Sequence, residues 1–367
     1  MNKCARIVKA EKAFTICNVK RKGPMKNVSV VGIDIAKRIF HLYGADSKGH
    51  KVMSKKVYRD EFLEAVAQLP KEAVVVMEAC GGAHYWGRRF QGLGFEVRLI
   101  APQFVKPYVK GNKTDMADAE AISEAALRPT MRYVRVKSIT EQELQHLHRA
   151  RELAIKSQTA EGNSIRGMLL EYGISLVQGK KGISEVSVQL EKYPERMSPV
   201  GRELIMRAVD RYKKSEEEVE WYDKKIEGIA KVHPVCKRLQ TVPGIGPIIS
   251  TALVAAVGDP SAFKNGRQFS AWLGIVPKQH STGGKQKLLG ISKRGDKYLR
   301  KQLIHGSRSL LYRAHLKTDT FSIWATNLKE RRGWNRTTVA IANKTARICW
   351  SILRFENDYQ STRAARV

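Results

Sequence analysis

The chain has 367 residues, 43% of them hydrophobic, which is long enough for two domains with separate cores and too apolar for a disordered protein. It carries 66 Lys and Arg against 35 Asp and Glu, and the formal net charge of +31 favours a polyanionic partner, above all nucleic acid. The sequence has neither a long apolar run nor a signal-peptide core, which predicts a cytoplasmic chain without membrane contact. With a nucleic-acid partner, the chain is expected to be nucleoid-associated. Five cysteines without zinc-ligand spacing argue against a zinc site and a disulfide framework.

We interpret residues 1–27 as a basic N-terminal arm and residues 28–137 as the first domain. Short runs rich in Val and Ile alternate with amphipathic stretches and predict strands over 28–36, 39–45, 51–58, 73–79 and 95–100, with helices over 61–69 and 84–94. The order βββαβαβ predicts an antiparallel meander that continues into a mixed α/β sheet covered by helices.

A further helix is predicted from Thr114, which serves as its N-cap, to Leu127. Apolar residues then recur at helical spacing over about 138–172 and 199–231, among many charges. These two stretches predict a long antiparallel helical hairpin, a coiled-coil connector over 138–235.

A second, mainly α domain is predicted over 236–355, followed by a tail over 356–367. Its sequence reads as helix, glycine turn and helix over 239–258, a helix near 269–274, a glycine-rich basic loop and three more helical stretches.

Four carboxylates stand where a sheet and a helix would bring them together. Asp34 ends the first predicted strand in GIDIAK, and Glu78 ends the central one in MEACGG. Asp115 and Asp118, three residues apart in KTDMADAEA, project from one helix face. Each acid alone is more often a turn or cap residue, but the combination favours a site for Mg²⁺ or Mn²⁺, because oxygen-preferring cations relieve the mutual repulsion of carboxylates.

These motifs are the basis of a family resemblance. GIDIAK, MEACGG and NKTDMADAEA resemble the DEDD signature of the bridge-RNA-guided insertion-sequence transposases of the insertion-sequence one-ten family. The resemblance implies a ribonuclease H-like first domain, similar to Holliday-junction resolvases, with Asp34, Glu78, Asp115 and Asp118 as its catalytic acids. Lys113, just before the Asp pair, is then a candidate phosphate contact or else a solvated lysine.

The second domain contains two candidate nucleic-acid contacts. TVPGIGP resembles the turn of a helix-hairpin-helix element, in which amides beside Gly244 and Gly246 hold a DNA phosphate; the alternative is a simple turn between helices. Between Lys278 and Arg313 there are ten Lys or Arg and one acid, which composition alone describes as a basic loop.

The resemblance extends through this segment to NKTARICWSIL and implies a transposase domain with a nucleophilic serine. Ser281 matches best; Thr282 is the nearest chemical substitute, and Ser292 and Ser270 are lesser candidates. Charge and position suggest four phosphate contacts: Lys285, Lys293, Arg294 and Arg300.

The family therefore implies a recombinase that cuts and rejoins donor and target DNA through a covalent phosphoserine. It also implies a structured non-coding guide RNA, a dimer or tetramer, and a site in which one subunit's serine meets another's carboxylates. Two alternatives stay open: a Holliday-junction-type endonuclease that hydrolyses with water, and a non-catalytic nucleic-acid-binding protein. A sugar-kinase-like ATPase would need glycine-rich phosphate turns after the later hairpins, and the sequence has none there.

Overall fold

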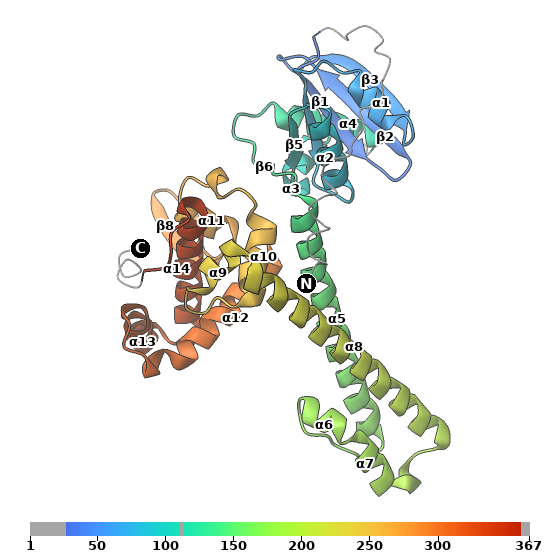
Figure 1. Cartoon of the computed structure of the whole chain (residues 1–367), viewed down its shortest axis with the longest axis vertical. Helices are drawn as coiled ribbons and strands as arrows, with labels where there is room; N and C mark the ends of the chain where they lie inside the picture. Colours follow the sequence, from blue (N-terminus) through green and yellow to red (C-terminus); the bar gives the residue numbers. More distant parts are fainter. Residues whose placement is uncertain (1–26, 111–113, 361–367) are drawn as a thin grey trace. The chain divides into compact units, whose positions relative to one another are not determined.

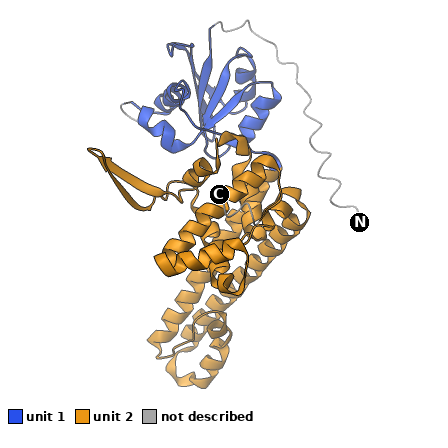
Figure 2. Cartoon of the chain, turned by 90° about the vertical axis from the view of Figure 1, so that its left-hand side faces the viewer, with its two compact units in different colours: residues 1–139 blue, residues 140–367 orange. Residues whose placement is uncertain are grey.

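The computed structural model describes residues 27–110 and 114–360, which divide into two compact units, 1–139 and 140–367 (Figure 2). Residues 1–26 of the predicted arm, Lys113 and the last part of the predicted tail lie outside the described residues. The finer division of the second unit into a connector and a domain from residue 236 stays a prediction. No helix within the described ranges is both long enough and apolar enough to cross a membrane.

The first unit is built on a six-stranded mixed sheet with the strand order β3-β2-β1-β4-β5-β6. The first three strands pair antiparallel, β4 and β5 run parallel to β1, and β6 closes the edge antiparallel, which confirms the predicted meander and mixed sheet. The strands are β1 (Val30–Ile35), β2 (Ile39–Ala45), β3 (Lys51–Tyr58), β4 (Val74–Glu78), β5 (Val97–Ile100) and β6 (Tyr133–Val134).

Helices cover the sheet of the first unit on both faces (Figure 1). They are α1 (Phe62–Ala67), α2 (Ala83–Gly92), α3 (Pro102–Val105), the 3₁₀ turn η3 (Lys106–Tyr108) and α4 (Asp115–Ala126). Phe62 of α1 and Phe90 of α2 pack with Ile33 and Met77 of the sheet in one core layer. The opposite layer joins α4 to alternate residues of the same strands, as the period of two in a strand requires.

The second unit begins with two long antiparallel helices, α5 (Ile139–Glu171) and α8 (Pro199–Val232), which confirms the predicted hairpin (Figure 1). Arg151 pairs with Asp223 near one end, and Glu161 pairs with Arg211 further along, so the helices run in opposite directions. The far end of the hairpin has its own small core with α6 (Lys180–Ser184) and α7 (Val186–Lys192); the 3₁₀ turn η4 (Pro194–Arg196) leads into α8.

A larger helical core follows in the same unit, with Leu253, Phe269, Leu303, Phe321 and Ile341 among its fully buried side chains. Its elements are α9 (Pro234–Gln240), α10 (Pro247–Val257), η5 (Pro260–Ala262), α11 (Gly266–Trp272), α12 (Lys297–Arg313), η6 (Ala314–Leu316), α13 (Thr320–Arg332) and α14 (Trp334–Phe355). This part is mainly α, as predicted.

The glycine-rich basic segment is a β-ribbon rather than the predicted loop. Strand β7 (Pro277–Thr282) pairs antiparallel with β8 (Lys285–Ile291). Gly283 and Gly284 form the two-residue turn, both with positive φ (55° and 76°), the conformation that tight hairpin turns need and glycine adopts without strain. The ribbon projects from the second unit with nearly all its residues exposed (Figure 2). A Gly-Gly pair between two strand-length stretches is the signal that predicts such a hairpin.

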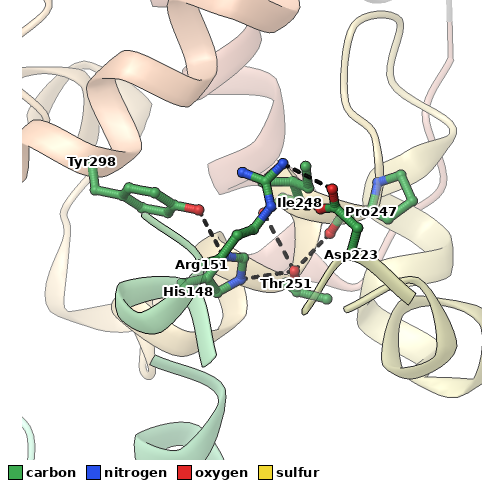
Figure 3. Close-up of polar contacts among 7 residues, drawn as sticks. All are labelled: His148, Arg151, Asp223, Pro247, Ile248, Thr251 and Tyr298. Carbon is green, nitrogen blue, oxygen red and sulfur yellow. Dashed lines mark hydrogen bonds and ion pairs between the residues drawn. The ribbon is translucent and has the colours of Figure 1, made fainter. Parts of the chain in front are cut away.

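A buried polar network centred on His148 joins α5 to α10 and α12 inside the second unit (Figure 3). The Thr251 hydroxyl donates to the Pro247 carbonyl at 2.6 Å, so its oxygen accepts from His148 Nε2–H at 3.0 Å. His148 Nδ1 then accepts from the Tyr298 hydroxyl at 2.8 Å. This arrangement requires a neutral imidazole with its proton on Nε2. The Arg151–Asp223 pair lies beside it and ties α5 to α8.

The network makes the stability of the second unit depend on pH. Burial, with a smaller contribution from the Arg151 charge, lowers the pKa of His148 to about 4 from an ordinary 6.5. The unfolded chain therefore binds the proton first, so the stabilisation is complete above the unfolded pKa and is lost as the pH falls towards the folded value. Between about pH 8 and about pH 5, the wild type should lose about 2 kcal/mol more unfolding free energy than His148→Gln. Urea unfolding at both pH values measures this difference, and equal losses would contradict the network.

Candidate functional site

Asp34 and Glu78 lie at the same edge of the sheet in the first unit. Strands β1 and β4 are parallel with Ile33 opposite Met77, so Asp34 and Glu78 follow side by side at the two strand ends. Ile33 and Met77 belong to the core layer under α1 and α2. Because successive side chains alternate between faces, Asp34 and Glu78 lie on the other face, the one that α4 covers.

Helix α4 begins over this edge. The Thr114 hydroxyl caps it by accepting from the Ala117 amide at 3.2 Å, as predicted, which places Asp115 and Asp118 in the first turn. Asp118 lies one turn before Ile122, which belongs to the same core layer as Val76 of β4, two residues before Glu78. Asp118 is thus on the side of α4 that faces the end of β4.

Asp115 lies on the side of α4 that faces β2. Its Oδ2 is 3.7 Å from Nδ1 of His41, the residue directly opposite Asp34 in the β1–β2 register. The His41 side chain is 12% exposed and that of Asp115 is 66% exposed. The buried His41 Nδ1 has no hydrogen-bond partner. Sequence reasoning missed His41, because only the strand register shows that it lies between Asp34 and Asp115.

The electrostatics of Cys80 also place Asp34 and Glu78 together. The pKa of this thiol is raised above its ordinary value, first by burial and then by the negative charges of Glu78 and Asp34. Both carboxylates therefore lie within electrostatic reach of one side chain just beyond the end of β4.

A close approach of α4 to β1 fixes this arrangement. A Cβ on Gly32 would lie 2.3 Å from the Ala119 carbonyl oxygen and 2.6 Å from the Ser123 amide nitrogen, both backbone atoms of α4. Only glycine lets the helix approach the strand here.

Gly32→Ala should therefore push α4 outward and destabilise the first unit by roughly 3 kcal/mol. Gly92→Ala is the matched control, because a Cβ there meets no atom within 4 Å, and its effect should stay within about 1 kcal/mol of zero. Urea unfolding of both variants measures the difference; equal stabilities would contradict the close contact.

Asp34, Glu78 and the first turn of α4 lie at one edge of the sheet, and they do not form a closed cage. Within residues 27–110 and 114–360, no group of three or more His, Cys, Asp or Glu side chains is arranged as a metal-binding cluster.

Ser281 lies near the tip of the ribbon in the second unit, opposite Gln286 of β8. Its Oγ accepts a hydrogen bond from Nε2 of Gln279 at 2.8 Å, and both side chains are exposed. Thr282 is the last residue of β7 and is exposed too. Ser270 is fully buried and donates to the Gly266 and Asn343 carbonyls, which rules it out as a nucleophile for DNA.

The four basic residues predicted to contact phosphate lie along the ribbon and beyond its base. Lys285 starts β8; Lys293 and Arg294 are exposed just after it. Arg300 is half-buried and donates from Nη1 to the Leu273 carbonyl at 3.1 Å, so it also holds the end of α11.

The predicted glycine turn lies between α9 and α10. Gly244 has φ +85°, and a Cβ on it would lie 2.8 Å from the Gly306 carbonyl oxygen, so packing against α12 already requires glycine there. A Cβ on Gly246 would meet no atom within 4 Å, and this residue precedes the first turn of α10. Phosphate binding by these amides stays a prediction.

Comparisons with known proteins identify the family. A family model of DEDD-type transposases, described as "Transposase", matches residues 31–174, and the model of the "Transposase IS116/IS110/IS902 family" matches residues 236–322. The first match spans the four acids and the second spans Ser281.

Three relatives resemble the chain over most of its length. The transposase for insertion sequence element IS1111A of Coxiella burnetii is 43% identical over 93% of this chain and 94% of its own length. A probable family 20 transposase of Pseudomonas aeruginosa is 45% identical over 91% and 99%. The transposase for insertion sequence element IS1328 of Yersinia enterocolitica is 36% identical over 89% and 97%. The chain therefore belongs to the IS116/IS110/IS902 family of insertion-sequence transposases.

Proposed function

We propose that this transposase cuts and rejoins DNA by attack of Ser281 on a backbone phosphodiester, with divalent cations held by Asp34, Glu78, Asp115 and Asp118. The observation that supports it most is the meeting of the first turn of α4 with the ends of β1 and β4. We also propose that the first domain is ribonuclease H-like, which the strand order β3-β2-β1-β4-β5 supports.

The donor chemistry of this edge fits Mg²⁺ or Mn²⁺. Four carboxylates offer the hard oxygen ligands that these ions take, and the buried, unpartnered His41 Nδ1 stands beside the most exposed of them. When bound, such an ion polarises phosphoryl oxygens and stabilises the leaving oxygen. His41 lies beside Asp115 and would orient this carboxylate without itself binding the ion.

The serine step conserves the phosphate ester. Ser281 Oγ forms a bond to phosphorus, one backbone phosphorus–oxygen bond breaks, and the serine proton leaves as the departing strand gains a hydroxyl. The hydrogen bond from Gln279 stabilises negative charge as it develops on Oγ. A strand hydroxyl then attacks the phosphoserine, restores the phosphodiester and frees the serine, so rejoining needs no external energy source.

Basic residues around the ribbon are proposed to hold the DNA backbone. Lys285, Lys293, Arg294 and Arg300 provide positive charge on and just beyond the ribbon. Amides beside Gly244 and Gly246 are a second proposed phosphate contact. All six positions fall inside the second family match.

The proposed partners are donor and target DNA, a structured non-coding guide RNA that pairs with both, and further copies of the chain in a dimer or tetramer. The family resemblance and the net charge of +31 support this set. Ser281 would act with the carboxylates of its own or a neighbouring subunit.

A cleavage assay tests the proposal. The chain is incubated with Mg²⁺, labelled DNA carrying the joined ends of the element, and RNA transcribed from the non-coding DNA beside its gene. We expect a protease-sensitive protein–DNA adduct on a denaturing gel, together with rejoined strands. Cut DNA with free ends and no adduct would instead indicate hydrolysis by a resolvase-type endonuclease. Binding without any cut would indicate a non-catalytic nucleic-acid-binding protein.

A further inference from the structure

Helix α14 carries a buried cation outside both family matches. Lys344 is 7% exposed, and residue 344 lies beyond residues 31–174 and 236–322. Within the described part of the chain, the charge that acts on Lys344 is that of Arg347, and the charge that acts on Arg347 is that of Arg267 on α11. Neither helix supplies an acidic partner to these three side chains.

The three cations lie on two packed helices and differ in exposure. Lys344 is buried, Arg347 is half-buried one turn further along α14, and Arg267 is exposed on the helix packed against it. The backbone of Arg347 touches α11 at Gly266, where an added Cβ would lie 3.1 Å from the Arg347 Cα. This tight helix contact keeps Arg267 beside Arg347.

Aromatic rings on α13 contact the buried Lys344. Nζ of Lys344 lies 4.7 Å from the centre of the Trp324 ring and 5.9 Å from that of Phe321. The ring faces attract the ammonium, but such contacts return less than burial of an unpaired charge costs. Accordingly, burial and then the Arg347 charge lower the pKa of Lys344 below its ordinary value. A bound anion would offset both the burial of the Lys344 charge and its repulsion by Arg347.

We propose that Lys344, Arg347 and Arg267 form an anion site that binds a backbone phosphate of the DNA on which this transposase acts. The site lies beside the root of the ribbon: Asn343 donates from Nδ2 to the Ile275 carbonyl at 3.3 Å, two residues before β7. A phosphate bound here is therefore held at a fixed place relative to the ribbon that carries Ser281. The choice of DNA as the source of the phosphate rests on the proposed function.

The test compares Lys344→Met with Lys213→Met, which removes the same charge from an exposed position on α8. Methionine keeps the length and the apolar stem of Lys344, so packing against the rings is retained. Duplex DNA binding is measured at several salt concentrations in the absence of divalent ions, so that no strand is cut. Thermal unfolding of each free protein is measured in parallel.

Lys344→Met should weaken DNA binding about tenfold and reduce the slope of log affinity against log salt by about one. Its melting temperature should equal or exceed that of the wild type, because a buried unpaired charge is gone. Lys213→Met should leave both the affinity and the slope close to wild type. Arg347→Gln, at the half-buried position, should repeat the loss of affinity and serves if the first variant fails to fold.

A folded Lys344→Met protein with the DNA affinity and salt slope of the wild type would overturn the proposal. If its melting temperature were also lowered, Lys344 would have a packing role alone. A loss seen with an RNA duplex but not with DNA would overturn the choice of DNA. Failure of the serine chemistry is separable, because a wild type that forms no covalent adduct still gives these binding results.

Discussion

Ser281→Ala is expected to eliminate the covalent protein–DNA adduct and to lower strand exchange by on the order of 10⁴-fold or more, the scale seen when a nucleophilic serine is removed. Attack by water leaves a free phosphate end instead of a phosphoserine ester, so rejoining is lost even where some cutting survives. DNA affinity and stability should stay near wild type, because the Ser281 side chain is exposed and its hydrogen bond comes from Gln279 on the same strand. Adduct formation on a denaturing gel and product yield measure the effect.

Thr282→Ala is the matched control, since it removes a neighbouring exposed hydroxyl from the same strand end. It should keep adduct formation within about tenfold of wild type, the range for a contact that is not the nucleophile. Loss of the adduct in Thr282→Ala with its retention in Ser281→Ala would move the nucleophile to Thr282. Retention in both would point to Ser292, which is half-buried at the base of the ribbon.

Glu78→Gln and Asp34→Asn are expected to lower strand cleavage by roughly 10³-fold or more, because the amide keeps the shape and loses the charge that holds a divalent cation. Added Mg²⁺ or Mn²⁺ should raise the melting temperature of the wild type and not that of either variant.

Glu72→Gln provides the control, with the same substitution at an exposed position of the same unit. It should respond to Mg²⁺ as the wild type does and cut DNA normally. A Glu78→Gln protein that behaves like Glu72→Gln in both measurements would remove Glu78 from the site.

Much of the first unit could be predicted from the pattern of its residues. Runs of Val and Ile over β1 and β4 identify buried strands, and a carboxylate directly after each run must fall at a strand end. Thr114 followed by acids marks the start of α4. What the pattern does not contain is register: His41 joins the site only because β2 pairs with β1 so that it faces Asp34.

The second unit shows where local patterns mislead. The basic composition around Gly283 and Gly284 suggests a loop, although a Gly-Gly pair between two strand-length stretches is itself a hairpin signal, and β7 pairs with β8 across it. The roles of His148 and Lys344 depend on helices distant in sequence, which bury one between Thr251 and Tyr298 and the other beneath Trp324. A single sequence shows that a polar residue lies in an apolar helix. It does not show the tertiary contact that offsets the cost of burying that residue.

Iron-directed cleavage of the protein backbone tests the central claim that the four acids surround one cation-binding place. Fe²⁺ replaces Mg²⁺ at oxygen-rich sites and, with ascorbate and peroxide, cuts the backbone beside the ion. We expect fragments that end next to Asp34, next to Glu78 and within Asp115–Asp118, all suppressed by excess Mg²⁺. Cleavage at only one of these three segments, or cleavage that Mg²⁺ does not suppress, would show that the acids do not share an ion.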